Sequence, residues 1–375
     1  MKTMAKRSKQ LHEEMLLFQI LPWLPARSLG RFKCVCKQWR SFLTTPMFTK
    51  MHLHHVNNQN HHKQLVFSTT KPCKYFRTID CETPEVGLSA NRSLPFKANC
   101  EEMSIIASLN GLVCIGIDPL HTCRYSDIIL WNPLTGGYKT LSKDNSRFNC
   151  FTIPARGYGL YYSSCEDDYR LLRVTLLNEA FIYSFKYDSW RKVESTNYRL
   201  SKYLDSSCLL NENLYLLAQS NTKTSLRSYS ILRFNTNTEK FTEIAAPSLQ
   251  RDVWCCFSLT VVSGCVYLCA STKGVYKGGK LDFCDGSGKF DLWKMDGDEE
   301  WTKVASICEF YQPFHLMMKN GNRLVVWGGS GNAYEVDLGM KTTKKVSTYT
   351  PTPTDGPMCF LWRGKFVETI VSPNK

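Results

Sequence analysis

The pattern of apolar and polar positions changes character near residue 65. Between residues 11 and 48, apolar side chains recur at steps of three and four residues, the period of a helix with one buried face. From Leu65 onward, short runs of β-branched and aromatic residues alternate with clusters of Asn, Gly, Asp, Ser and Pro, which is typical of many short strands. The chain is therefore expected to hold a small helical domain followed by a large β domain.

Two helices are predicted in the first part. One runs over residues 13–21 and ends where Pro22 and Pro25 interrupt the chain, because proline lacks the amide hydrogen that a helix interior needs. The second begins with Ser28 as its N-cap and ends before Pro46, since the residue preceding a proline disfavours the helical conformation. The apolar positions of this second helix are Leu29, Phe32, Val35, Cys36, Trp39, Phe42 and Leu43. A segment this short lacks an ordinary independent core, so we expect another protein to complete its apolar surface.

The predicted domain boundaries follow these changes of pattern. Residues 1–10 form a basic N-terminus expected to be mobile, residues 11–50 the helical domain, residues 51–64 a linker rich in His and Asn, and residues 65–375 the β domain. The linker holds five of the eight histidines, but their spacing is irregular and no carboxylate or thiol lies among them. A solvated linker is therefore favoured over a metal site, and no metal ligand is assigned.

A motif recurs through the β domain at a spacing of about 50 residues: an apolar strand, a polar turn, an aromatic residue and a second strand. Its closing aromatics are Tyr138, Trp190, Phe241 and Trp301. A period of about 50 residues matches the blade of a kelch-like β-propeller. We therefore predict a mainly β fold, a propeller of about six blades, in which each closing aromatic packs between adjacent blades.

The formal net charge of +14 is concentrated at the start of the chain. The first 50 residues hold ten Lys or Arg against two acids, Glu13 and Glu14. An acidic protein partner is the first expectation for such a surface, and nucleic acid is the second. Nucleic acid is disfavoured because the basic residues between 27 and 40 alternate with core positions of a helix, and the β domain has no concentrated basic stripe.

Cysteine usage and apolar runs indicate the compartment. The 17 cysteines contain no C-x-x-C pair, their number is odd, and many lie inside apolar runs, where Cys acts as a small hydrophobe. Reduced thiols are expected in a protein of the cytoplasm, the nucleus or both. The basic start and apolar run near residue 20 resemble a signal peptide only superficially, because acids and Pro22 interrupt them. No apolar run reaches the about 18 residues that span a bilayer.

Motifs for catalysis are absent from the sequence. It contains no G-x-S-x-G, H-E-x-x-H or Walker-type loop, so no catalytic residue and no cofactor are assigned. The carboxylate run Glu166, Asp167 and Asp168 follows two serines and is interpreted as a solvated turn. A propeller-fold hydrolase or oxidase stays an alternative, because fold does not fix function.

The helical segment resembles an F-box, the motif that docks a substrate receptor of an SCF-type ubiquitin ligase onto its Skp adaptor. The likeness is carried by Leu16, Ile20, Leu21, Leu24, Pro25, Ser28, Leu29, the run of residues 31–37 (RFKCVCK), Trp39 and residues 46–48. The β domain resembles the plant F-box-associated interaction domain, which is related to kelch-type propellers. The matching pieces are residues 108–112 (SLNGL), 131–136 (WNPLTG), 157–159 with 167–169, and 183–184 with 189–191. His12 and Gln19 depart from the usual Pro and Glu of the F-box.

The resemblance implies a non-catalytic receptor subunit of an E3 ubiquitin ligase. Its F-box would bind a Skp-family adaptor, and through it cullin and RING subunits, while its propeller would bind an unidentified target protein for ubiquitination. The adaptor contacts that the resemblance implies are Leu16, Ile20, Leu21, Leu24, Pro25, Leu29, Val35, Cys36 and Trp39. The Gly- and Lys-rich tract of residues 271–289 is a candidate recognition loop, with Tyr276, Lys277, Lys280 and Phe283 as its candidate contacts, and a flexible insertion is the alternative.

Overall fold

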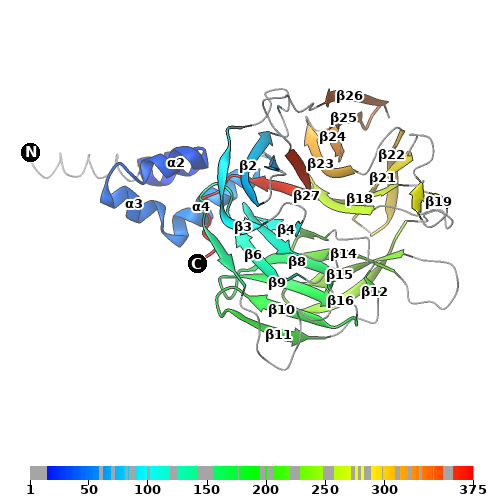
Figure 1. Ribbon diagram of the computed structural model, residues 1–375, viewed down its shortest axis with the longest axis horizontal. Helices are drawn as coiled ribbons and strands as arrows, with labels where there is room; N and C mark the ends of the chain where they lie inside the picture. The colour runs from blue at the N-terminus through cyan, green and yellow to red at the C-terminus, as the bar shows by residue number, and fades with distance from the viewer. Residues whose placement is uncertain are drawn as a thin grey trace, which may run out of the picture.

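The computed structural model describes residues 15–58 and, within residues 62–374, the strands given below with many of their connections. The main gaps in this description are residues 142–154, 201–206, 220–228, 248–256, 283–288 and 349–357, and the expectation for residues 1–10 lies outside it. Two parts are visible in Figure 1: a small helical unit, residues 15–58, in blue, and a ring of β-sheets.

The helical unit contains more helices than the sequence predicts. Its elements are the π-helical turn η1 (Leu16–Ile20), the 3-10 turn η2 (Leu21–Trp23), α2 (Ala26–Phe32), α3 (Lys37–Leu43) and α4 (Pro46–Asn58). The break at Pro22 and Pro25 is confirmed, but the predicted N-cap Ser28 is wrong, because α2 already begins at Ala26. The predicted second helix is also wrong as one element: residues 33–36 separate α2 from α3.

The predicted linker is largely helical, which corrects its assignment as a solvated bridge. Residues 51–58 belong to α4, which begins at Pro46, a residue favoured in a first helical turn because its fixed φ suits the helix. The first strand then starts at His62, three residues before the predicted boundary at Leu65. His52, placed in the linker by its neighbours in sequence, is fully buried in the structure.

The β domain is a ring of six blades among the described residues (Figure 1). The first blade combines β27 (Met358–Val367), β1 (His62–Ser68), β2 (Cys73–Asp80) and β3 (Arg92–Ala98). The next two are β4 (Met103–Leu109), β5 (Leu112–Ile117), β6 (Asp127–Trp131) and β7 (Tyr138–Thr140), then β8 (Ala155–Ser163), β9 (Asp168–Thr175), β10 (Ala180–Ser184) and β11 (Ser189–Val193).

The other three blades continue in chain order. The fourth holds β12 (Arg199–Leu200), β13 (Ser207–Leu210), β14 (Asn213–Gln219), β15 (Tyr229–Asn235) and β16 (Lys240–Ala245). The fifth holds β17 (Phe257–Val262), β18 (Cys265–Ser271), β21 (Lys289–Met295) and β22 (Trp301–Cys308), with a separate hairpin of β19 (Val275–Lys277) and β20 (Lys280–Asp282). The sixth holds β23 (Pro313–Lys319), β24 (Arg323–Gly328), β25 (Asn332–Asp337) and β26 (Thr342–Thr348).

The first strands of the blades contact one another in a closed circle, β27, β4, β8, β13, β17, β23 and again β27. The ring is closed by pairing of distant segments, because β27 runs antiparallel to β1 in the first blade. The prediction of a propeller of about six blades is confirmed.

Hydrophobic clusters fill the spaces between successive blades, and the closing aromatics belong to them. Trp190 packs in the cluster between the second and third blades, Phe241 against the cluster between the third and fourth, and Trp301 against the cluster between the fourth and fifth. Tyr138 contacts Phe96 of the first blade, with ring centroids 5.8 Å apart. The predicted inter-blade role of the closing aromatics is confirmed.

A repeated turn geometry presents these aromatics. Two residues before each aromatic, the backbone adopts a positive φ: 76° at Gly136, 51° at Asp188, 56° at Glu239 and 63° at Glu299. This conformation lets the polar turn reverse the chain tightly, so the aromatic falls at the start of the outer strand. In three of the four turns the residue with positive φ is an acid rather than glycine, although a side chain is disfavoured there.

Two further expectations concern the thiols and the membrane. None of the eight cysteines described structurally forms a disulfide, and Cys114 and Cys269 lie buried in inter-blade clusters as small apolar side chains. Across the described part of the chain, no helix has both the length and the apolar character needed to cross a bilayer.

Candidate functional site

The helical unit carries a dense set of exposed apolar side chains. Among the described residues, the large apolar side chains exposed on this unit are Met15, Phe18, Ile20, Trp23, Val35 and Met47. The much larger propeller exposes Tyr75, Tyr138, Leu177, Tyr187 and Met340. Concentration of exposed apolar side chains on a short unit is typical of a surface that binds another protein.

The structure sorts the nine residues predicted to contact an adaptor. Leu21 and Leu29 are 2% and 0% exposed and form the core of the unit with Leu17, Leu43 and Phe48. Both side chains are closed to solvent in this structure, and their predicted contact with an adaptor stays a prediction. The exposed members are Ile20, Pro25, Val35 and Cys36, and the half-buried ones are Leu16, Leu24 and Trp39.

The turn between α2 and α3 presents Val35 to solvent. The amides of Lys33, Cys34 and Val35 donate to the carbonyls of Leu29, Arg31 and Phe32, so the end of α2 winds into a tight turn. Cys36 then caps α3, since its Sγ accepts a hydrogen bond from the amide of Trp39 at 3.4 Å. The result is that Val35, 62% exposed, stands out between two helices.

Four exposed side chains on the unit are not among the nine predicted adaptor contacts: Met15, Phe18, Trp23 and Met47. The ring of Phe18 contacts Phe42 edge-on with centroids 5.1 Å apart, and Trp23 lies over His55 at 3.9 Å. Helical periodicity marks apolar positions without saying which of them face solvent. A signal was present at Trp23, because it stands between two prolines where the chain cannot continue as a regular helix.

The charged side chains of the helical unit are all basic within residues 15–58. Residues 15–58 contain no Asp or Glu, while Arg31, Lys37 and Arg40 are exposed near the apolar turn. Arg27 and Lys50 pair with acids of the propeller side of the molecule, Glu368 at 2.7 Å and Asp167 at 2.8 Å. The helical unit thus exposes apolar and cationic side chains and, within residues 15–58, no acidic ones, which favours an acidic partner.

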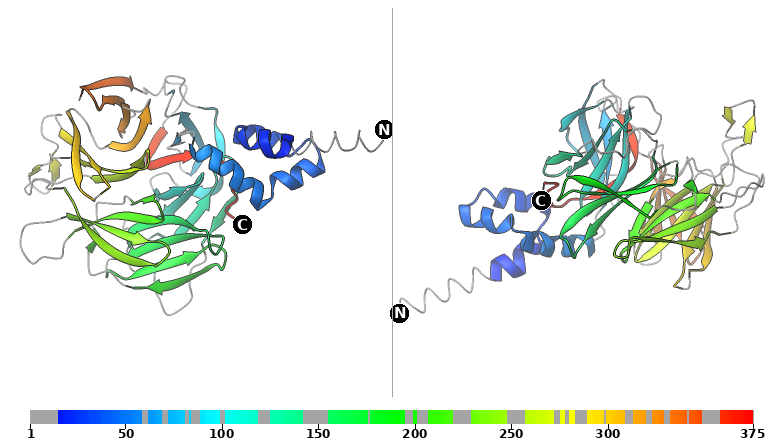
Figure 2. Two further views of the ribbon diagram at one scale, coloured as in Figure 1. Left: turned by 180° about the vertical axis from the view of Figure 1, so that it is seen from behind. Right: turned by 90° about the horizontal axis from the view of Figure 1, so that it is seen from below.

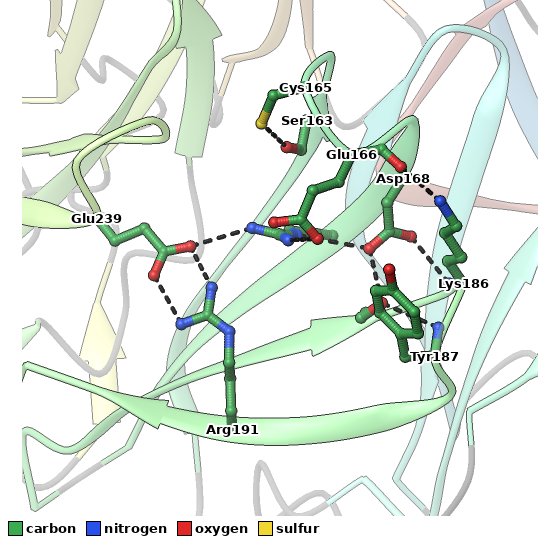
Figure 3. Close-up of polar contacts among 10 residues, drawn as sticks. Ser163, Cys165, Glu166, Asp168, Lys186, Tyr187, Arg191 and Glu239 are labelled. Carbon is green, nitrogen blue, oxygen red and sulfur yellow. Dashed lines mark hydrogen bonds and ion pairs between the residues drawn. The ribbon is translucent and has the colours of Figure 1, made fainter.

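The carboxylate run in the third blade is an exposed turn at Glu166 and Asp167, as predicted, but the interpretation as a solvated turn is wrong at Asp168. This residue is 2% exposed and accepts hydrogen bonds from the hydroxyl of Ser184 at 2.6 Å and the amide of Lys186 at 2.8 Å (Figure 3). The Nε of Arg170 donates to the same carboxylate at 3.5 Å. Asp168 therefore joins two turns of one blade, and its carboxylate oxygens already accept hydrogen bonds from within the protein.

The same network joins the third and fourth blades. The Nη1 of Arg170 donates to Glu239 of the next blade at 3.1 Å, and Arg191 forms a second ion pair with that carboxylate (Figure 3). Arg233 and Glu299 form the corresponding pair between the fourth and fifth blades. The acids with positive φ in the closing turns thus bind cations of the preceding blade, which explains why these turns carry acids instead of glycine.

Glu239→Gln is expected to lower the free energy of unfolding of the propeller by about 1–2 kcal/mol. A neutral amide forms no ion pair with Arg170 or Arg191 and has only one oxygen that can accept their hydrogen bonds. Chemical denaturation at low and high salt measures the effect, which should be smaller at high salt. Glu300→Gln is the matched control, since Glu300 is an exposed acid of a closing turn and its change should stay within about 0.5 kcal/mol. Equal effects of both substitutions would contradict the assigned inter-blade role.

The candidate recognition loop is described only in part. Tyr276 and Lys277 lie on β19 and Lys280 on β20, which pair as a hairpin, and Phe283 lies outside the described residues. In the right-hand view of Figure 2 this hairpin, in yellow, projects from the propeller at the end far from the helical unit. Its role in recognition stays a prediction.

The connections between strands of the propeller differ in length according to the strand that they follow. Connections that follow the second and fourth strands of a blade include residues 118–126, 141–154, 194–206, 220–228 and 272–288, whereas those after first strands are short turns such as residues 110–111, 211–212 and 263–264. In a propeller these two sets leave opposite faces, because antiparallel strands alternate in direction. The helical unit contacts the short-turn face, since Asn57 bonds Asn110 and Lys50 pairs with Asp167.

No metal site is indicated in the described part of the chain, where no group of three His, Cys, Asp or Glu side chains has the geometry for an ion. Three histidines of the predicted linker, His52, His54 and His55, lie on α4, and His62 begins β1. His52 points into the unit, and His55 stacks on Trp23.

Comparison with known proteins provides an independent finding. Residues 64–327 match the model of the F-box associated beta propeller domain, and residues 14–54 match an F-box-like model. An F-box/kelch-repeat protein of Arabidopsis thaliana is 25% identical over 344 residues, which cover 80% of this chain and 81% of that protein. An F-box/LRR-repeat/kelch-repeat protein of the same plant is 25% identical over 249 residues, or 66% of this chain and 64% of that protein.

Other similarities are more partial. A further Arabidopsis F-box protein is 27% identical over 247 residues, and the match spans 57% of its length. The chain therefore spans less than two thirds of the length of two of these three relatives. A chain in a crystal structure of the mitotic checkpoint complex is 9% identical with a TM-score of 0.39, covering 67% of this chain and 78% of that chain, a similarity too low to bear on the fold.

Proposed function

The chain belongs to the F-box proteins that carry an F-box-associated β-propeller domain, and from that premise we propose that it is the substrate-recognition subunit of an SCF-type ubiquitin ligase. The helical unit binds a Skp-family adaptor, and the propeller binds a target protein. The observation that carries this proposal is that the unit exposes apolar and cationic side chains and, within residues 15–58, no acidic ones.

The adaptor contacts are assigned to the exposed and half-buried members of the predicted set. Ile20, Pro25, Val35 and Cys36 contact the adaptor directly, and Leu16, Leu24 and Trp39 border them. Burying a side chain of the size of Val or Ile contributes roughly 1.5–3 kcal/mol, so a few such anchors give a specific complex. Leu21 and Leu29 act from inside, by holding the surface in shape.

The target is assigned to the face of the propeller at which the second and fourth strands of the blades end. That face lies opposite the short turns that contact the helical unit, so a target and an adaptor can be bound at the same time. Long surface connections on a rigid scaffold are where recognition residues usually lie. The β19–β20 hairpin belongs to this face.

The protein supplies proximity rather than chemistry in this proposal, as F-box proteins typically do. Through the adaptor it joins cullin and RING subunits, and holding the target beside the ubiquitin donor converts an encounter of separate molecules into an effectively intramolecular one. Such a complex operates in the cytoplasm or nucleus, in agreement with the free thiols.

Ile20→Asp and Val35→Asp are each expected to weaken adaptor binding by about tenfold or more, because a buried carboxylate replaces an apolar anchor at the interface. Binding of the full-length protein to a purified Skp-family adaptor, measured by calorimetry, tests this expectation. Both residues are exposed in the free protein, so the variants should fold normally.

Met340→Asp is the matched control, since Met340 is equally apolar and 76% exposed but lies on the propeller. Its affinity for the adaptor should equal that of the unmodified protein. Normal adaptor binding by both Ile20→Asp and Val35→Asp would overturn the proposal. Salt-sensitive binding of nucleic acid without adaptor binding would favour the basic-protein alternative instead.

A further inference from the structure

We propose that the two motifs of residues 108–112 (SLNGL) and 131–136 (WNPLTG) form an intramolecular binding site for residues 368–371, here called the closing segment, and that this contact fixes the helical unit on the propeller. The inference concerns the orientation of the two parts and does not depend on which adaptor or target the protein binds. It assigns a role to motif residues that the proposed function leaves unexplained.

Asn132 is the first half of this site. Its Nδ2 donates to the carbonyls of Thr369 at 3.0 Å and Val371 at 2.7 Å, and its Oδ1 accepts from the amides of Leu134 and Thr135 at 2.8 and 3.2 Å. The side chain is fully buried, and its two bonds to the closing segment form away from water. One asparagine thus orders its own turn and holds two carbonyls of the closing segment.

Asn110 and Gly111 form the second half. The hydroxyl of Thr369 donates to the carbonyl of Asn110 at 2.8 Å, and Thr369 is fully buried. Gly111 has a φ of +81°, and a Cβ added there would lie 2.2 Å from the Oγ1 of Thr369 and 2.7 Å from the carbonyl oxygen of Val367. Glycine is therefore required both for the turn and for the close approach of the segment.

The closing segment presents its other side chains to the helical unit. Ile370, 7% exposed, packs in the core of that unit with Leu29 and Phe48. Glu368 pairs with Arg27 at 2.7 Å and with Lys63, at the start of β1, at 3.4 Å. The segment is consequently shared between the two parts of the molecule, bonded to the second blade on one side and to the helices on the other.

Direct contacts of α4 support the same orientation. Lys50 pairs with Asp167 at 2.8 Å, and this hydrogen bond is the main reason that the pKa of Asp167 is lowered. Asn57 donates to the side chain of Asn110 at 3.2 Å, and Leu53 packs against the cluster between the second and third blades. Asn110 accepts hydrogen bonds from Asn57 of α4 and from Thr369 of the closing segment. The motif of residues 108–112 therefore joins the second blade to both of these elements.

This arrangement changes the expectation that a partner protein alone completes the apolar surface of the helical unit. One part of that surface is covered from within the chain, by Ile370 and Leu134. The closing segment follows β27, the strand that closes the ring against β1. Closure of the propeller and placement of the helical unit are therefore coupled through a few residues of continuous chain.

Gly111→Ala in the full-length protein tests the coupling, with Gly264→Ala as its matched control. Both glycines have positive φ, +81° and +72°, and both lie in the turn between the first and second strands of a blade, but nothing lies within 4 Å of the added Cβ at Gly264. Hydrogen exchange read by mass spectrometry should rise at least tenfold in residues 368–374 and in α2 and α4 for Gly111→Ala. Gly264→Ala should leave exchange in those segments unchanged.

Thr369→Val is the second variant, and it tests the proposed contact even if Gly111→Ala fails to fold. It keeps the size of the side chain and removes only the hydroxyl that donates to Asn110. Faster exchange in α2 and α4 without faster exchange in the fourth and fifth blades supports the proposal. Unchanged exchange in α2 and α4 overturns it.

Discussion

Phe48→Ala is expected to destabilise the helical unit by about 3–5 kcal/mol, the usual range for removing a fully buried aromatic side chain. Phe48 is 0% exposed, its ring lies 5.2 Å from that of Phe42 edge-on, and it stacks on His52 at 6.3 Å. The unit is small, and a loss of this size is comparable to the whole stability that a core of its size supplies. Amide exchange in residues 15–58 should approach that of an unfolded chain, while the inter-blade clusters stay protected.

Met47→Ala is the control for this substitution. Met47 precedes Phe48 in α4 but points to solvent at 57% exposure, so its removal should change the free energy of unfolding by no more than about 0.5 kcal/mol. Similar destabilisation by both substitutions would mean that α4 does not present the face described here. Comparison of Met47 and Phe48 thus tests which face of α4 packs inside the helical unit.

Acidification is expected to destabilise the helical unit through His52. Its Nε2 lies 3.1 Å from the carbonyl oxygen of Leu24, to which the neutral ring donates. Its Nδ1 is buried without a hydrogen-bond partner, so a second proton would place a charged donor in an apolar site. The pKa of His52 is lowered from 6.5 to about 4, mainly by burial; the Leu24 carbonyl opposes the shift and the nearby His55 adds to it.

The sign of this effect follows from proton uptake. The unfolded chain binds the proton below about pH 6.5 and the folded chain only near pH 4, so stability is complete above 6.5 and falls as the pH is lowered through this window. The difference corresponds to about 3 kcal/mol. Thermal unfolding of the helical unit between pH 7 and 4 measures it. The step should vanish in His52→Leu and persist when exposed His54 is replaced by Gln.

The propeller was predictable because its signals are local and repeated. Each closing turn carries its own polar residues and its own aromatic, so the spacing of Trp190, Phe241 and Trp301 revealed the blades without knowledge of tertiary contacts. The ion pairs that join blades were not predictable. Glu239 meets Arg170 and Arg191 only after two blades stand side by side, and no sequence spacing encodes that meeting.

The helical unit was predicted less well because burial there depends on partners far along the chain. Periodicity selected Leu21 and Ile20 alike, yet one is in the core and the other at the surface. His52 was assigned to a solvated linker since its neighbours are polar, but the carbonyl of Leu24 and the ring of Phe48 surround it. Ile370, which completes this core, lies over 300 residues away in sequence.

The position of β27 has a consequence for synthesis on the ribosome. β27 is translated after every other described strand, yet it is the partner that β1 needs in the first blade. A nascent chain therefore holds an unpaired β1 edge until translation has passed residue 367, and such edges invite pairing with other chains. A transcript with an early stop codon would yield a product that has the exposed apolar side chains of the helical unit but neither a closed ring nor Ile370, and we expect chaperones or proteases to act on it.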